Sequence, residues 1–477
     1  MNNNESNNRK WLVLGITSVS TFMATLDGSI VNIGLPIMSS QLHVSIDAIQ
    51  WVVTAYFLTI AILLLVWGKI ADLFGKKSIF AAGFIVFSIG SAFCSFSSTL
   101  TLLVISRVVQ AIGASAMMAL SQAIVTEAFP PTERGRALGF VGTMVALGSL
   151  VGPSLGGILV GMFGWPSIFL INIPIGVFGF AATIFIIPTS ENKPSPVTFD
   201  VRGTLLFSFS LLVLFLGLLF VQEGRIPTIL LIPTVLIAAF GLWLFIRTEQ
   251  RAKNPLLDLG LFRLHEFSFG LTAAYLVFIA INATMLFVPF YLQDVLKFDP
   301  LKAGLVISAY PLTMAVVAPL SGWLSDHISY RPLTVAGTVI STIAFLVLTT
   351  LNASSSVLKI VVLLIFLGAG MSIFQSPNNS SIMGCVPRAQ LGIAGGANAL
   401  FRNLGLVSGT TFSVLIFSFV TKLNINNLTG TFDAGVFVHG LSVIFLFSAA
   451  CTLAAAIISL TRAVRCRLDD RRLDDAG

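Results

Sequence analysis

Charged residues are scarce in this sequence. Only 10% of its 477 residues are Asp, Glu, Lys or Arg, whereas an ordinary soluble domain has about 25%. Hydrophobic residues make up 56% of the chain, and the polar stretches between the apolar runs are short. This composition excludes a soluble fold and indicates that most of the chain lies in a lipid bilayer.

Residues and motifs that mark other functions are also missing. The four Cys and four His residues are scattered without metal-like or paired spacing, so we predict no metal site. There is no Gly-x-x-x-x-Gly-Lys-Ser/Thr loop for ATP, and no Gly-x-Ser-x-Gly or His-Glu-x-x-His motif. We therefore predict that the protein is not an enzyme and has no cofactor. The net charge of +7 reflects loop charges rather than nucleic-acid binding.

Apolar runs of membrane-spanning length recur along the chain. A bilayer core about 30 Å thick requires roughly 20 apolar residues per helix. The sequence predicts an all-α integral membrane protein of about fourteen helices. We place them at 11–35, 49–68, 79–97, 101–124, 137–162, 166–187, 203–222, 227–247, 267–292, 303–324, 333–351, 357–378, 396–420 and 436–460. The first run is too long for a signal-peptide core and is expected to be retained.

The basic residues predict the orientation. With both termini in the cytoplasm, 21 of the 27 Lys and Arg residues fall inside, five fall outside, and Arg107 lies within a helix. Cytoplasmic loops are enriched in Lys and Arg. We expect a multi-pass protein of the cell membrane with both termini cytoplasmic.

The chain contains an internal repeat. Gly68–Asp72 ends the second predicted helix, and Gly322–Asp326 ends the tenth with the same Gly-x-x-x-Asp spacing. Repeated halves are typical of transporters. Long polar interruptions at 189–196 and 247–266 flank a central helix pair. We predict three parts: a six-helix bundle at 1–190, two inserted helices at 191–265, and a six-helix bundle with a short basic tail at 266–477.

Four local patterns occur together where one family has its signatures: Gly68–Lys77, Gly148–Gly157, Leu26–Pro36, and Arg107 with Gln110 and Gly113. With them the chain resembles the major facilitator superfamily, specifically its fourteen-helix drug:proton antiporter branch. The resemblance implies two pseudo-symmetric six-helix bundles and two additional central helices. It also implies export by alternating access, driven by the proton gradient. One departure is Pro166-Ser167 after Trp165, where the family often has Arg-Trp.

The motif between the second and third helices predicts a cytoplasmic latch. Gly68 and Gly75 permit close backbone approach or a turn, and Asp72 can cap a neighbouring helix. The resemblance implies that Asp72 pairs with a loop arginine such as Arg136 in one conformation and releases it in the other. Lys76 holds the loop inside. The alternative is a simple turn with topogenic charges.

The fifth predicted helix has a glycine-rich face. Gly148, Gly152, Gly156 and Gly157 leave room for close packing of another helix, and Pro153 removes a backbone donor and bends the helix. The resemblance implies a pliable, sealed contact between the two halves. The alternative is ordinary packing of small residues.

Asp27 is the clearest acid inside a predicted membrane helix. Charges there are costly and usually face a pathway. We expect Asp27 to take up and release a proton, and when ionised to attract a cationic substrate. The alternative is a structural carboxylate bonded to Asn32 or a helix start. Arg107 has no acid one turn away, so its partner comes from elsewhere; the resemblance implies a part in proton coupling, and a structural role is the alternative.

Further polar residues are candidates for gates and for the cavity lining. The stretch Gln375–Asn379 and the pair Arg402-Asn403 are similar to polar stretches of the family. Here they lie near the cytoplasmic ends of their helices, where we expect gate contacts. The candidates for the cavity lining are Asn32, Gln110, Asn172 and Asn282, together with Tyr275, Gln122 and Asn398.

These predictions combine into a proton-coupled secondary transporter that exports amphipathic, cationic or zwitterionic, drug-like molecules. The alternative is an antiporter dedicated to one metabolite, antibiotic or lipid. The second reading stays open because Glu223, Asp294 and Asp299 sit at helix ends, whereas a polyspecific cation exporter is expected to carry acids in its cavity. The expected partners are the substrate, protons and the lipid bilayer, without nucleic acid, and the sequence is compatible with a monomer.

Overall fold

The protein is seen here in a computed structural model that describes residues 3–188, 199–222, 227–252, 254–422 and 434–474. The polar stretch 189–196 and Glu223 lie outside these residues. Within them all regular elements are helical, and fourteen segments are long and apolar enough to cross a membrane. The prediction of an all-α membrane protein with fourteen spans is confirmed.

The first six spans form one bundle, which we call the first half. Its helices are α1 (Asn3–Gln41), α2 (Ile46–Ile49), α3 (Trp51–Phe74), α4 (Lys76–Ser95), α5 (Leu100–Ala128), η1 (Pro131–Glu133), α6 (Arg134–Phe163), α7 (Ser167–Leu170) and α8 (Asn172–Ile186). Their packing is pairwise: α1 contacts α6, α4 contacts α5 and α8, and α3 contacts α5.

The last six spans form the second half. Its helices are η3 (Leu259–Arg263), α11 (His265–Phe290), η4 (Tyr291–Val295), α12 (Pro300–Ile307), α13 (Ala309–Ile328), α14 (Tyr330–Leu348), α15 (Val357–Gly384), η5 (Arg388–Gln390), α16 (Leu391–Thr421) and α17 (Ala434–Asp474). Here α14 packs on α15 and α17, and α11 packs on α16 and α17.

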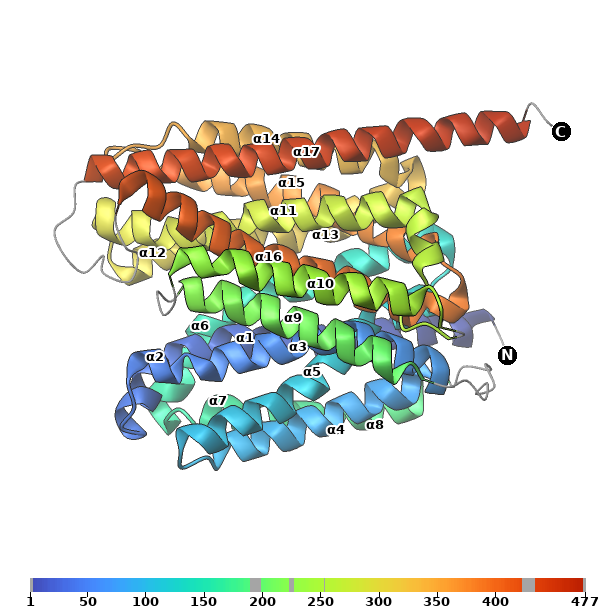
Figure 1. The fold of residues 1–477 in the computed structure, drawn as a ribbon, viewed down its shortest axis with the longest axis horizontal. Coiled ribbons are helices and arrows are strands. Elements are labelled where there is room, and N and C mark those ends of the chain that lie inside the picture. The colour runs from blue at the N-terminus through green and yellow to red at the C-terminus, as the bar shows by residue number, and fades with distance from the viewer. Residues whose placement is uncertain (1–2, 189–198, 223–226, 253, 423–433, 475–477) are drawn as a thin grey trace.

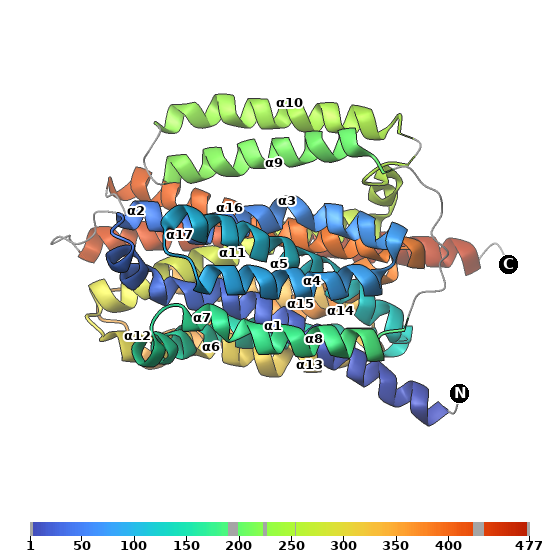
Figure 2. The ribbon, with the colours of Figure 1, turned by 90° about the horizontal axis from the view of Figure 1, so that it is seen from below.

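The two middle spans stand apart from both halves. Helices α9 (Val201–Gln222) and α10 (Leu231–Glu249), with the short η2 (Thr228–Leu230), pair with each other. Figure 2 shows them as a separate layer outside the bundle, with α9 on the inner side. Contacts of α9 with α3 and α16 attach this pair to the rest.

Both chain ends lie at the same side of the bundle. The first described residues of α1 and the last of α17 are at the right in Figure 1. We call this side the terminal side. The two halves meet where α3 and α5 contact α16, and where α6 contacts α13 and α15.

Several helices run beyond their predicted ends. For example, α16 begins at Leu391 rather than near residue 396. The first backbone N–H groups of a helix need partners from outside the helix, and for α16 they come from a side chain of the other half, described below. Apolar periodicity along α16 alone contains no sign of that partner.

Candidate functional site

A fully buried polar cluster lies inside the first half. Asp27 of α1 places its Oδ2 2.5 Å from Nη1 of Arg107 on α5. Its Oδ1 accepts hydrogen bonds from Gln110 Nε2 and from Asn172 Nδ2, each at 2.8 Å. The carboxylate therefore ties α1 to α5 and α8. Arg107 has its carboxylate partner on another helix, as the sequence required.

The surroundings of Arg107 complete this cluster. Its Nε donates to the carbonyl of Val52 at 3.1 Å, and its Nη1 also donates to Gln110 Oε1 at 2.6 Å. The guanidinium carbon lies 4.0 Å from the centre of the Tyr56 ring. Asp27, Arg107, Gln110 and Tyr56 are all 0% exposed. Removing one partner of such a buried pair costs about 3–5 kcal/mol, because the other charge is left uncompensated.

In this conformation Gln110 and Asn172 do not line a cavity between the halves, because both amides hold Asp27 inside the first half. Asn282 is occupied within the second half, where it donates to the carbonyl of Leu406 at 2.8 Å and to Thr410. Asn32 is an exposed residue of α1, and no hydrogen bond joins it to Asp27 in the described structure. Short amide side chains are satisfied by whichever helix packs nearest, which the linear sequence does not reveal.

The glycine face of α6 packs against α1, within the first half. A Cβ on Gly148 or Gly152 would overlap Thr25 or Ser29 of α1, and a Cβ on Gly156 would lie 2.8 Å from Ile30 Cγ1. The Ser29 hydroxyl donates to the carbonyl of Gly148 at 3.0 Å. The prediction that this face seals the two halves together is therefore wrong for this conformation. The contact instead holds the turn of α1 that carries Asp27.

Not every residue of this motif takes part in the contact. A Cβ on Gly157 would meet nothing within 4 Å. Pro153 lies inside α6, which continues through it to Phe163. Gly157 thus offers a matched control for the packed glycines.

We expect Gly152→Leu to abolish transport and Gly157→Leu to leave it nearly unchanged. The leucine at 152 would force α6 away from α1 beside Asp27, where overpacking costs about 1–3 kcal/mol. Membrane insertion of both variants is compared by gel filtration, and transport is measured in inside-out vesicles. Normal transport by a correctly inserted Gly152→Leu variant would contradict the importance of this contact.

The two halves are joined at the terminal side by a pair of carboxylate caps. Asp72, at the end of α3, accepts from the backbone N–H groups of Gly392 and Ile393 at 2.8 and 2.9 Å. These N–H groups open α16 of the second half. A carboxylate at a helix N-terminus is favoured by the unpaired N–H groups and by the helix dipole.

Asp326, at the end of α13, makes the symmetric cap. It accepts from the backbone N–H groups of Gly135 and Arg136 at 2.7 and 2.9 Å, at the start of α6. Asp72 is thus not paired with Arg136 in this conformation, and the pairing stays a prediction for the other conformation. Arg136 belongs to the Asp326 cap through its backbone, and its guanidinium carbon lies 5.1 Å from the centre of the Trp11 ring.

Glycines allow the helices to meet closely at both caps. A Cβ on Gly68 would overlap the carbonyl of Gly392, and a Cβ on Gly135 would overlap that of Gly322. Lys76 lies 3.6 Å from Asp72 and 3.3 Å from Glu127. Gly75 has a φ of 98° between α3 and α4, a backbone conformation that favours glycine. The terminal side is closed.

We expect Asp72→Asn combined with Asp326→Asn to weaken this closure. Each aspartate loses its charge-assisted bonds to two N–H groups, worth about 1.5–3 kcal/mol each. In a background without the native cysteines, spin labels at the exposed positions 74 and 389 should report a longer distance in the double variant. An unchanged distance distribution would show that the caps do not hold the halves together.

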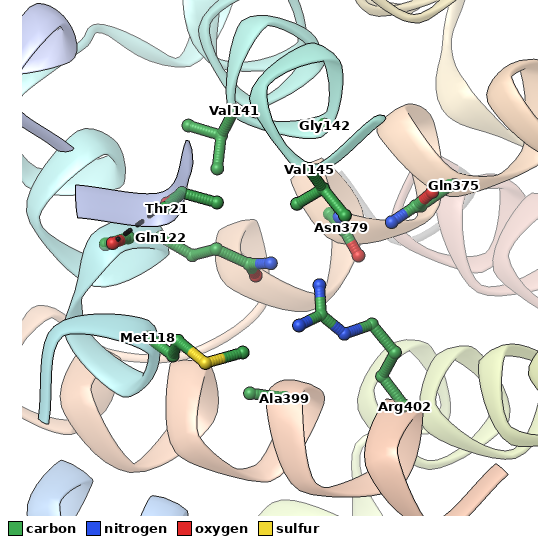
Figure 3. Close-up of a pocket in the computed structure, with 11 residues that line it drawn as sticks. Thr21, Met118, Gln122, Val141, Gly142, Val145, Gln375, Asn379, Ala399 and Arg402 are labelled. Atoms are coloured by element: carbon green, nitrogen blue, oxygen red, sulfur yellow. Dashed lines mark hydrogen bonds between the residues drawn. The ribbon is translucent and has the colours of Figure 1, made fainter. Parts of the chain in front are cut away.

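A small polar cavity lies between the halves. Its walls come from α1, α5 and α6 on one side and from α15 and α16 on the other, and Figure 3 shows these residues: Thr21, Met118, Ser121, Gln122, Val141, Gly142, Val145, Gln375, Asn379, Ala399 and Arg402. The space within is about 20 Å³, little more than one water molecule needs. Asn398 spans the two halves by donating to Gln122 Oε1 at 2.7 Å and Asn379 Oδ1 at 2.9 Å.

Two predictions about the second half can now be compared with the geometry. Ser376 donates to the carbonyl of Gly135 at 3.1 Å, which is a contact between the halves beside the caps. Arg402 was counted among the cytoplasmic charges, with Arg107 as the basic residue inside a helix. That placement is wrong, because Arg402 lies well inside α16 and reaches the cavity. The signal in the sequence was the position of Arg402 within the predicted apolar helix 396–420.

Two similar halves, fourteen spans and a polar cavity between the halves define the class of this protein as a two-halved membrane transporter. The major facilitator superfamily model matches residues 17–410. The chain belongs to the major facilitator superfamily.

Two relatives and one solved structure illustrate this membership. The chain is 37% identical over 404 residues to the riboflavin transporter RibZ of Clostridioides difficile, covering 85% of this chain and 87% of RibZ. It is 32% identical over 416 residues to the multidrug resistance protein Stp of Mycobacterium tuberculosis, covering 86% and 76%. The human organic anion transporter MFSD10 has a similar fold, with a TM-score of 0.65, 14% identity, and 93% and 99% of the two chains covered.

Proposed function

We propose that this transporter is a proton-coupled exporter of amphipathic small molecules that works by alternating access in the cell membrane. The observation that carries this proposal is the fully buried ion pair of Asp27 and Arg107. A carboxylate so placed is a candidate for a site that takes up a proton when the conformation gives it access to water. The terminal side is taken as the cytoplasmic side, in keeping with the distribution of Lys and Arg.

Protonation of Asp27 removes its charge and with it the ion pair to Arg107. The guanidinium then keeps Gln110, the Val52 carbonyl and the Tyr56 ring as partners. The link between α1 and α5 is loosened, so the proton changes the balance between two conformations rather than only a local bond.

Helix α6 provides a path from this site to the contact between the halves. One stretch of α6 packs on the turn of α1 that carries Asp27, through Gly148 and Gly152. The terminal end of the same helix packs on α13 through Gly135 and receives the Asp326 cap. A shift of α1 would therefore be transmitted along α6 to the closure of the terminal side.

This geometry changes the charge that we expect the substrate to carry. Asp27 is fully buried and paired, and it does not line the cavity between the halves. Direct attraction of a cationic substrate by Asp27 is therefore not favoured in this conformation. Proton and substrate would compete through the conformational equilibrium instead of for one carboxylate.

The second candidate is transport dedicated to one metabolite. Identity of 37% to RibZ over most of both chains favours it, as does a cavity lined by several amides that suit specific hydrogen bonding. RibZ is by name a riboflavin transporter, and riboflavin is the first metabolite to test.

The test of coupling is gradient-driven transport in inside-out vesicles. An acid interior should drive accumulation of a fluorescent amphipathic dye or of riboflavin, and a protonophore should abolish it. Vesicles that lack this transporter serve as the control. Accumulation that is insensitive to the protonophore would contradict proton coupling, and accumulation of riboflavin alone would favour the dedicated transporter.

A further inference from the structure

Arg402 is a half-buried cation inside α16 that makes no ion pair with any residue the structure describes. Its Nε is buried and has no hydrogen-bond partner. No acidic side chain lines the cavity that its guanidinium enters. Figure 3 shows the guanidinium directed into the space between Gln122, Asn379 and Val145. A charge without a partner inside a membrane span is costly and is usually retained for function.

The neighbouring amides add hydrogen-bond donors to the same space. Asn398 donates to the amide oxygens of both Gln122 and Asn379, so each of these oxygens already accepts one hydrogen bond. The amide nitrogen of Gln122 makes no hydrogen bond in the described structure, and neither does that of Gln375. The cavity thus presents a guanidinium and free N–H groups beside an apolar wall of Met118 and Val145.

We propose that the transported substrate is an organic anion, whose carboxylate, sulfonate or phosphate group binds Arg402. This inference rests on the proposed function, since it takes the cavity between the halves as the substrate path. A planar guanidinium pairs well with such oxygen groups. Met118 and Val145 contact the apolar part of the molecule.

The proposal also gives a physical link between binding and closure. The closed cavity of about 20 Å³ is too small for a substrate, so binding requires the halves to separate. When the halves pack around the bound molecule in a wider arrangement than this one, its negative charge offsets the cost of the unpaired Arg402 guanidinium. A neutral or cationic molecule does not do this, and the cavity therefore selects by charge.

Equilibrium binding to the purified full-length protein tests this without any proton gradient. Two xanthene dyes of similar size serve as probes: carboxyfluorescein, which is anionic, and rhodamine 123, which is cationic. Fluorescence anisotropy is recorded for the wild type and for Arg402→Gln, Arg402→Lys and Arg251→Gln. Arg251 is exposed and provides the same substitution away from the cavity.

We expect saturable binding of carboxyfluorescein to the wild type and weaker binding of rhodamine 123. Arg402→Gln should weaken carboxyfluorescein binding about tenfold or more, in line with the loss of a charged hydrogen bond. The affinity of Arg402→Lys for carboxyfluorescein should lie between those of the wild type and Arg402→Gln, and the affinity of Arg251→Gln should match that of the wild type. Without dye, Arg402→Gln should unfold at a higher temperature than the wild type because an unpaired charge inside the membrane span is gone.

The proposal is overturned if the wild type prefers rhodamine 123, if it shows no saturable binding of carboxyfluorescein, or if Arg402→Gln binds that dye as the wild type does. Should Arg402→Gln fail to fold, the preference of the wild type between the two dyes decides. Failure of this test leaves gradient-driven transport intact. Failure of proton coupling likewise leaves the binding result intact, so the two claims are separable.

Discussion

Replacing Asp27 with Asn should abolish coupled transport and lower the stability of the protein. Asparagine keeps the shape of the side chain but cannot lose a proton, and it leaves Arg107 without its counter-charge at 0% exposure. Breaking one side of a buried ion pair costs about 3–5 kcal/mol. Thermal unfolding of the purified variant should move to a clearly lower temperature, and gradient-driven uptake should disappear.

The matched control is the double variant Asp27→Asn with Arg107→Gln. It removes both charges, so no buried charge is left alone, and stability should recover relative to the single variant. Transport driven by the pH gradient should remain absent, because the site for the proton is gone. A double variant that is stable and still concentrates substrate against a gradient would mean that the ion pair is purely structural.

The second large effect is expected at the start of α6. Gly135→Ala should prevent closure of the terminal side, since even a methyl group at this position would overlap the carbonyl of Gly322 in α13. Backbone cannot move aside as a side chain can, so the halves must stay apart there. Transport should fall to background, while binding of substrate from the terminal side should persist.

Gly384→Ala is the control for this substitution. Gly384 ends α15, and a Cβ there would meet nothing within 4 Å, so transport should be retained. The distance between spin labels at the exposed positions 74 and 389 compares the two variants, and it should increase only in Gly135→Ala. Wild-type transport by Gly135→Ala would contradict the close contact of α6 with α13.

The spans could be predicted from sequence because one physical quantity decides them. A helix that crosses the membrane needs about 20 apolar residues, and such a run can be identified from consecutive residues of the sequence alone. The close packing of Gly148, Gly152 and Gly156 could also be foreseen, because runs of small residues at helical spacing have few other uses. What that packing touches, namely α1 rather than the second half, could not be foreseen.

The hydrogen-bond partners of the polar side chains could not be predicted from the sequence. The arrangement of the halves brings Asp72 to Gly392 and Asp326 to Gly135. Almost every residue type has a backbone N–H group, so the sequence does not show which of these groups a carboxylate caps. Gln110 and Asn172 likewise looked like residues of a cavity. Their actual partner, Asp27, lies on a third helix.

The depth of Arg402 in the membrane span also depends on a contact that the sequence does not show. Counted by loop, this residue supports the orientation of the chain, although the predicted helix 396–420 already contains it. The observed start of α16 at Leu391 places it eleven residues from the helix start. That start depends on the cap from Asp72 in the other half. A tertiary contact thus decides how far inside the helix this arginine lies.

The most direct test of the account is proton movement caused by substrate itself. Substrate is added to inside-out vesicles that hold a preformed pH gradient, and a pH-sensitive dye follows the protons for the wild type and for Asp27→Asn with Arg107→Gln at matched expression. The account predicts proton efflux in the wild type and none in the double variant. Equal proton efflux in both would contradict Asp27 as the coupling site.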